Sequence, residues 1–276
     1  MEFRITTLVE NTVPKGRGFL GEHGLSFFIE AGDRKVLFDT GQGSALTKNA
    51  ECLGIDLASV DTVVLSHGHY DHTGGIGALL SVNRRFTLYA HPDVFAEKVA
   101  LREGQARDIG FSLTRKALEA AGIRVVMDTR PMEIVPGVAT TGEVPMCTSY
   151  ESIDPALFMR REGTLVPDPL KDDLSLILRG RDKTGVLLGC AHRGVVNILT
   201  HVRTLTGKAR IDVIAGGMHL MGATETVLKR IIEDVEAFTP MLLAPGHCTG
   251  FPAIWALWTA FQERFQLNQV GSVIQI

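Results

Sequence analysis

The stretch Ser66–Gly75 reads Ser-His-Gly-His-Tyr-Asp-His-Thr-Gly-Gly and follows a short apolar run, Asp61–Leu65, which is typical of a buried strand. Three histidines and one carboxylate lie close together here, and two glycines end the stretch. This composition is poorly suited to the interior of a helix or strand, whereas it suits a loop that holds a metal ion. The sequence therefore predicts a metal-binding loop at the end of a buried strand.

The four candidate ligands in this loop divide into two pairs. His67 and His69 are two residues apart, so an extended backbone directs both imidazoles to the same side. Asp71 and His72 follow a turn and are placed to face a second metal ion. Imidazole and carboxylate groups bind zinc, iron or manganese, and histidine binds as the neutral base. We expect two divalent metal ions, with zinc favoured over iron or manganese.

Two metal ions need more protein ligands than one loop provides, and later strand ends offer several. Cys190 and His192 follow an apolar run and lie on the same side of an extended backbone. His247 lies in a glycine-flanked turn, where the backbone can approach a metal closely. We predict His192 and His247 as ligands, and leave ligation by Cys190 open because a free cysteine is commonly a small core residue. His219 is predicted to be a ligand, a proton donor or a substrate contact.

Other polar residues carry weaker signals. His23 could line the site, although an ordinary loop position is favoured, and His91 before a proline is interpreted as a loop residue. His201 lies outside the apolar face of its predicted helix and is expected at the surface. Asp39 ends an apolar strand and is predicted to support a ligand histidine by accepting a hydrogen bond from its ring, not to bind metal itself.

Short apolar strands alternate with amphipathic helices along the chain, without a linker rich in proline, serine or charge. We therefore predict one mixed α/β domain spanning residues 1–276, with helices outside stacked sheets. An irregular segment at 144–172 is predicted to be an active-site loop. The expected strands are 3–9, 25–30, 36–38, 61–65, 86–90, 123–127, 132–135, 137–141, 174–179, 184–189, 211–215, 241–244 and 270–275. The expected helices are 44–53, 76–82, 93–102, 112–121, 195–205, 224–238 and one that contains Trp255 and Trp258.

Composition and charge argue against several classes of function. A formal net charge of −3 provides no basic surface for nucleic acid or for an anionic membrane. No apolar run approaches the ~18 residues that span a bilayer, and Met1–Thr6 lacks the features of a signal peptide. The widely spaced cysteines make no CxxC pair, so disulfides are not expected. We expect a cytoplasmic protein whose partner is a small-molecule substrate; the sequence does not determine the oligomeric state.

The pattern His-x-His-x-Asp-His after a buried strand resembles that of the metallo-β-lactamase-fold hydrolases. This resemblance implies a four-layer αββα sandwich, a ligand histidine late in the chain, and a supporting role for Asp39. Further segments resemble one subgroup of this superfamily, labelled 7,8-dihydropterin-6-methyl-4-(β-D-ribofuranosyl)aminobenzene-5′-phosphate synthase. These segments are residues 22–26, 141–145, 189–192, 216–220 and 246–250.

One part of the chain departs from the usual pattern of this superfamily, which has a third histidine between the loop motif and a later bridging aspartate. No histidine lies between His91 and His192, and the strand end expected to supply the aspartate reads Gly189-Cys190. Either His192 takes the role of the third histidine and no aspartate bridges, or Cys190 takes the bridging place and Glu143 replaces the histidine. We favour the first arrangement.

The resemblance and the ligand set predict a metal-dependent hydrolase, or a related transferase, that acts on a phosphorylated or pterin-like small molecule. A metal-bound hydroxide would attack a phosphoryl or acyl centre, with Asp71 holding the second metal and orienting the hydroxide. His219 would stabilise charge or protonate the leaving group. The alternatives are a lactonase or thioesterase with the same metals, and a metal-bound ligand sensor without turnover. Basic residues that could meet a phosphate are Lys15, Arg17, Arg160, Arg161 and Lys171.

Overall fold

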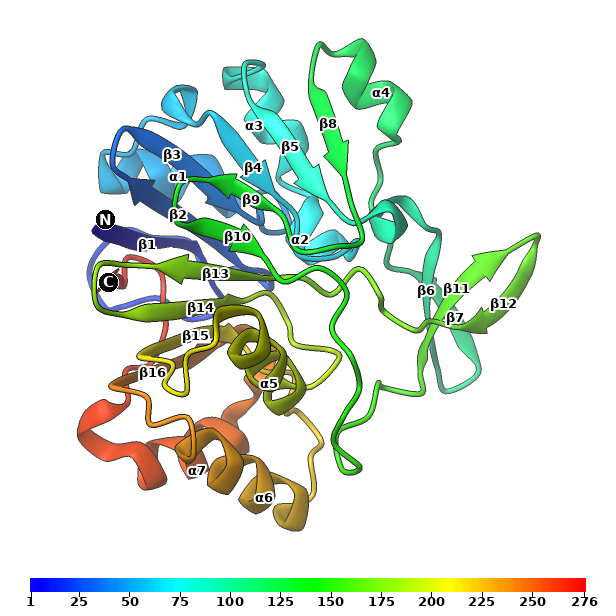
Figure 1. Ribbon diagram of the computed structural model, residues 1–276. Helices are drawn as coiled ribbons and strands as arrows, with labels where there is room; N and C mark the ends of the chain where they lie inside the picture. The colour runs from blue at the N-terminus through cyan, green and yellow to red at the C-terminus, as the bar shows by residue number, and fades with distance from the viewer.

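Two β-sheets packed face to face form the centre of this computed structural model, which describes residues Met1–Ile276 (Figure 1). The first sheet has seven strands in the order β17-β1-β2-β3-β4-β5-β8, and β3, β4, β5 and β8 run parallel. Its strands are β1 (Phe3–Val9), β2 (Ser26–Ala31), β3 (Arg34–Phe38), β4 (Thr62–Val64), β5 (Thr87–Ala90), β8 (Arg124–Met127) and β17 (Val273–Gln275).

The second sheet has six strands in the order β16-β15-β14-β13-β10-β9, and β14, β15 and β16 run parallel. Its strands are β9 (Glu133–Val135), β10 (Val138–Thr140), β13 (Ser175–Arg179), β14 (Thr184–Leu188), β15 (Val213–Gly217) and β16 (Leu242–Gly246). Each sheet thus contains a run of parallel strands, whose crossover connections are long enough to contain helices.

The side chains of the central strands alternate between an apolar cluster that lies between the sheets and clusters that lie under helices. In β3, Val36 and Phe38 pack between the sheets, whereas Leu37 packs on the helix side of the first sheet. In β14, Leu187 packs between the sheets, whereas Val186 and Leu188 pack on the helix side of the second sheet. This period of two is what a strand buried on both faces requires.

Helices cover the outer face of each sheet and complete four layers (Figure 1). The predicted mixed α/β class and the αββα arrangement are therefore confirmed. A short turn, α2 (Tyr70–Thr73), lies within the metal loop. None of the helices has both the length and the apolar character that crossing a lipid bilayer requires. The helices on the first sheet are α1 (Ala45–Leu53), α3 (Ile76–Val82) and α4 (Arg115–Ala120), and those on the second are α5 (Val195–Thr206), α6 (Glu225–Glu236) and α7 (Phe251–Phe261).

A third, smaller sheet projects to one side of the two central sheets (Figure 1). Its strand order is β12-β11-β6-β7, and it consists of two hairpins joined through the pairing of β11 with β6. Its strands are β6 (Lys98–Arg102), β7 (Gln105–Asp108), β11 (Leu157–Arg161) and β12 (Thr164–Pro167).

This smaller sheet corrects two expectations from the sequence. The helix predicted over 93–102 is wrong, because Pro92–Phe95 form a single 3₁₀ turn and a strand follows. The segment 144–172 is not irregular throughout, because it contains the hairpin of β11 and β12. In both cases the strand is stabilised by a partner far along the chain, with Val99 opposite Phe158, which a local pattern does not reveal.

The parallel strands bring their carboxyl ends to the same side of the structure, where the candidate ligands follow them. In the first sheet, Asp39 comes directly after β3, and His67 lies just beyond β4. In the second sheet, Cys190, His219 and His247 follow β14, β15 and β16. Carboxyl ends of parallel strands are the usual place for binding sites in α/β folds. The strand order therefore gathers residues that are widely separated in sequence.

Lys98 joins the smaller sheet to the metal loop through a buried ion-pair network. Its Nζ lies 2.8 Å from Oδ2 of Asp168 and 2.9 Å from Oδ1 of Asp172. The other carboxylate oxygen of Asp172 accepts a hydrogen bond of 2.8 Å from the backbone N–H of Gly68, in the metal loop. The side chains of the lysine and both aspartates are almost completely buried. This network therefore couples the position of β6 to the metal loop.

Replacing Lys98 with methionine should lower the free energy of unfolding by about 3–5 kcal/mol, because two buried carboxylates lose their cation. Urea unfolding followed by circular dichroism measures this change. The matched control is Lys48→Met, which breaks an exposed pair with Glu51 and should cost less than about 1 kcal/mol. A loss for Lys98→Met that is no larger than the control would contradict the structural role of the network.

Candidate metal centre

Three buried histidines form the first group of donor atoms. Nε2 of His67 lies 3.0 Å from Nδ1 of His69 and 3.2 Å from Nε2 of His192. The opposite ring nitrogens of His69 and His192, Nε2 and Nδ1, are buried and have no hydrogen-bond partner. A neutral imidazole carries one N–H and one lone pair. If the outer nitrogens of His69 and His192 carry the protons, Nδ1 of His69 and Nε2 of His192 each keep a lone pair that points toward His67. This arrangement fits a metal ion better than a hydrogen-bond network.

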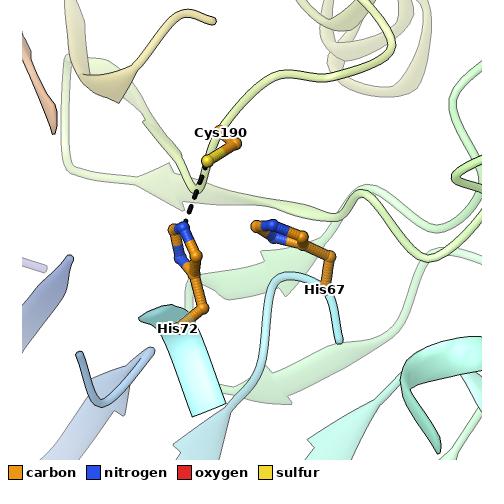
Figure 2. A group of neighbouring side chains, drawn as sticks. All are labelled: His67, His72 and Cys190. Atoms are coloured by element: carbon orange, nitrogen blue, oxygen red, sulfur yellow. Dashed lines mark hydrogen bonds between the residues drawn. The ribbon is translucent and has the colours of Figure 1, made fainter. Parts of the chain in front are cut away.

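A second group of donors lies next to the first. Nε2 of His72 lies 3.1 Å from Nε2 of His247, and Oδ2 of Asp71 lies 3.3 Å from the same His247 atom. The sulfur of Cys190 lies 3.1 Å from Nε2 of His72. Figure 2 shows His67 and His72 of the metal loop converging with Cys190, which follows β14, and the donor atoms of the three lie within 4.8 Å of one another. Cys190 therefore lies between the two groups.

Asp39 positions the metal loop and one of its rings. Its Oδ1 accepts a hydrogen bond from the backbone N–H of Ser66, and its Oδ2 accepts one from the Ser66 hydroxyl, both at 2.7 Å. The same Oδ2 lies 2.7 Å from Nδ1 of His72, which directs Nε2 of that ring toward the second group. Oγ of Ser66 also lies 2.8 Å from Nδ1 of His67. This geometry agrees with the supporting role predicted for Asp39.

The loop that follows β1 holds His247 in place, although the sequence did not indicate it. Oδ1 of Asn11 lies 3.0 Å from Nδ1 of His247, so the amide oxygen can accept from the ring and leave Nε2 free to bind metal. The carboxylate of Glu10 accepts a hydrogen bond from the backbone N–H of His247. Both residues directly follow β1 of the first sheet, whereas His247 follows β16 of the second, so the second group depends on the packing of the two sheets.

Several residues at these strand ends adopt a left-handed backbone conformation that is unusual for side chains with a Cβ atom. The φ angles are 60° at Asp39, 58° at Ala191, 46° at His219 and 51° at His247. Such conformations cost about 1–3 kcal/mol each and gather at functional sites. Here the sharp turns direct side chains into the space between the strand ends.

The two groups differ in their electrostatics. Burial lowers the pKa of His67 well below its ordinary value and that of His69 to about 3, so both rings are neutral at pH 7. Burial works to raise the pKa of Asp71, but His72 and other nearby rings outweigh it and hold that pKa well below the usual range. Burial likewise opposes a charge on His72, but Asp39 and Asp71 raise its pKa to about 9. The second group thus contains an ion pair when no metal is bound.

Three further residues lie beside these groups. The ring centroid of His219 lies 4.2 Å from that of His192, and its Nδ1 is buried without a partner. His23, for which an ordinary loop position was favoured, instead lies beside the second group, with Nε2 3.2 Å from Oδ2 of Asp71. Cys248, which the sequence did not single out as a ligand, can share a metal-binding group with residues of the second set. Its position one residue after His247 was the available signal.

Glu143 does not join the centre. Its carboxylate lies 3.3 Å from Nε2 of His91 and 3.4 Å from Nζ of Lys171, and it belongs to none of the groups that could hold an ion. Of the two arrangements considered from the sequence, the geometry agrees with His192 as the third histidine. Cys190 nevertheless occupies the place between the two groups. The structure thus combines His192 from the first arrangement with Cys190 from the second, and Glu143 lies outside the centre.

A sequence model of the metallo-beta-lactamase superfamily matches residues 20–259 of the chain. The chain therefore belongs to the metallo-β-lactamase superfamily, whose fold is that of metal-dependent hydrolases, and the predicted resemblance is confirmed. A crystal structure of Tm1679, a metal-dependent hydrolase of the beta-lactamase superfamily, has a TM-score of 0.83 at 26% identity and covers 99% of both chains.

Two proteins of Methanocaldococcus jannaschii are similar over the whole length of the chain. One is a 7,8-dihydropterin-6-methyl-4-(beta-D-ribofuranosyl)-aminobenzene-5'-phosphate synthase, 28% identical over 99% of this chain and 96% of its own length. The other is an uncharacterised protein that is 31% identical over 99% of this chain and 100% of its own length. The subgroup suggested by the sequence segments is thus represented among the relatives.

Asp39→Asn should weaken zinc binding at the second group of donors about 10- to 100-fold, because the ring of His72 loses the charged acceptor that orients it. Competition with a chromophoric zinc chelator measures this affinity. Asp128→Asn is the matched control, since that partly exposed carboxylate pairs with Arg130 at the surface. Equal zinc affinity in Asp39→Asn and the unchanged protein would contradict the role assigned to Asp39.

Zinc affinity at the second group should rise with pH up to about 9. His72 is protonated below that pKa in the metal-free protein and must lose its proton before Nε2 can bind a metal. The proton displaced from His72 alone contributes about a tenfold gain in affinity per pH unit. Calorimetric titrations in buffers of different ionisation enthalpy count the released proton. Affinity that does not change between about pH 6.5 and 8.5 would contradict this assignment.

Proposed function

We propose that this chain is a metal-dependent hydrolase, or a related transferase, that acts on a phosphorylated or pterin-like small molecule. The observation that carries this proposal is a cavity of ≈ 450 Å³ whose wall includes His219 and also His192, a member of the first donor group. Ligand pockets typically enclose about 300–1,000 Å³, so the cavity suits a ring-bearing small molecule. The name of the synthase from M. jannaschii supports the substrate class.

The donor chemistry fits two divalent transition-metal ions, with zinc favoured and iron or manganese as alternatives. Nitrogens at about 2.0–2.1 Å from one zinc ion in tetrahedral geometry lie about 3.3 Å apart. The separations of 3.0 and 3.2 Å in the first group are close to this value. The proposed ligands are His67, His69 and His192 for one ion, and Asp71, His72 and His247 for the other.

Bound metal ions would supply a nucleophilic water at neutral pH and polarise the oxygen of the group under attack. Asp71 is ionised and would accept a hydrogen bond from the attacking water, which orients it. His219 would hold a proton on Nδ1, which has no partner within the protein, and deliver it to the leaving group. Burial disfavours a proton on His219, but Cys248 outweighs this effect and raises the pKa of the ring.

Two parts of the chain contribute apolar surface to the cavity wall. Met218 and Leu220, from the turn after β15, provide apolar surface on one side. Ile153 and Pro155 provide it on the other, and they belong to the segment 144–172. An apolar wall with a few polar groups is typical of small-molecule sites. Its place in this wall supports the proposal that the segment is an active-site loop.

One basic residue is placed to meet a phosphate. Arg102 lines the cavity, where its guanidinium lies 2.7 Å from the carboxylate of Asp154. Arg160 and Lys171, which the sequence offered for this role, pair with acidic side chains and do not line the cavity. A phosphorylated substrate would therefore compete with Asp154 for Arg102, a bidentate donor suited to phosphate oxygens.

His69→Ala should remove the metal of the first group and reduce hydrolysis to background, because three histidines can no longer share one ion. Elemental analysis and a panel of phosphate ester, lactone and thioester substrates measure both effects. His201→Ala is the matched control, since that ring contacts the carbonyl oxygen of Thr141 on another part of the fold. The substrate of the panel that is converted distinguishes a phosphoryl reaction from the lactonase and thioesterase alternatives.

Unaltered protein that contains no metal after growth in metal-supplemented medium would overturn the proposal. Binding of a pterin-like ligand without product over hours would instead favour the ligand sensor.

A further inference from the structure

Two cysteine sulfurs lie among the donor atoms of the second group. Cys190 follows β14 and Cys248 follows β16, and their sulfurs and a ring nitrogen of His247 all lie within 4.8 Å of one another. Both cysteines are free, with exposed fractions of 3% and 7%. Gly217 leaves space for this approach, because a Cβ atom there would lie 2.7 Å from the sulfur of Cys248. The strand ends therefore bring two thiols together beside the proposed metal ligands.

These cysteines are not ordinary core residues. Neither belongs to any of the apolar clusters of the structure, although their neighbours Ala191 and Met218 do. The sulfur of Cys190 faces Nε2 of His72 at 3.1 Å, and that of Cys248 lies 3.5 Å from the carbonyl oxygen of Cys190. Each sulfur thus faces a polar atom, a contact that apolar packing alone does not require.

We propose that Cys190 and Cys248 are thiolate ligands of the metal centre. Cys190 would contact the metal ions at both donor groups, and Cys248 would contact only the ion at the second group. The sharing follows from geometry, because donor atoms of both groups, His67 in the first and His72 in the second, lie within 4.8 Å of the Cys190 sulfur. On binding, each S–H bond breaks, its proton is released to solvent, and a sulfur–metal bond forms. This inference rests on the proposed function, since it assumes that the centre binds metal.

Sulfur donors would decide which metals the centre accepts. Thiolates are soft ligands that favour zinc, cobalt and iron, whereas magnesium and manganese prefer oxygen ligands. A site with only Asp71, His72 and His247 would discriminate less between these metals. The cysteine pair would therefore select zinc-like ions for the second position, in place of the carboxylate that bridges the metals in most members of the superfamily.

Cobalt(II) substitution of the metal-depleted protein tests this inference. A thiolate bound to cobalt absorbs in the near ultraviolet by charge transfer, whereas any protein-bound cobalt shows weaker visible bands. We expect the charge-transfer band in the unaltered protein, a band about two thirds as intense in Cys248→Ser, where two of the three proposed cobalt–sulfur bonds remain, and none in the double variant Cys190→Ser/Cys248→Ser. The matched controls are Cys52→Ser and Cys147→Ser, which replace exposed cysteines and should leave the band unchanged.

The two bands separate failure of this inference from failure of the proposed function. Visible bands without charge transfer would overturn thiolate ligation but leave the metal-dependent hydrolase intact. Absence of both would show that no cobalt binds and would overturn the proposed function as well. Because serine variants can fail to fold, zinc X-ray absorption of the unaltered protein provides a second test. A sulfur shell at about 2.3 Å supports the inference, and a shell of nitrogen and oxygen alone at about 2.0–2.1 Å overturns it.

Discussion

The carboxylate of Asp39 is the group on which the arrangement of the metal centre most directly depends. It binds the backbone and hydroxyl of Ser66 at the start of the metal loop and contacts the ring of His72 near its end. Through Ser66 it also influences the ring of His67. A single buried charge thus orients one donor in each group, and its own backbone is held in the left-handed region with a φ of 60°.

The strained strand ends keep their positions because close-packed layers lie on all sides. One apolar cluster lies between the two sheets and one lies under the helices of each sheet, so the strands have little freedom to shift. The buried network around Lys98 adds a connection from the smaller sheet to the backbone of Gly68. The fold itself therefore places the donors of both groups, which would lower the ordering cost of binding metal.

The two groups of donors differ in charge, and this difference links the centre to its proposed chemistry. The first group consists of neutral imidazoles, whose burial disfavours protonation. The second contains the ionised Asp71 and has two thiols beside it. An anionic ligand set would bind its ion with a stronger dependence on pH and on metal type. The cavity lined by His192 and His219 adjoins the first group of donors.

The sequence by itself determined the metal loop, the alternation of strands and helices, and the α/β class, because each is a pattern of neighbouring residues. It did not determine the smaller sheet, since β6 pairs not only with the neighbouring β7 but also with β11, far along the chain. Nor did it separate Glu143, which lies outside the centre, from Cys248 and His23, which lie beside it. The tertiary structure decided these positions, because the order of parallel strands in two packed sheets, not spacing along the chain, sets which strand ends meet.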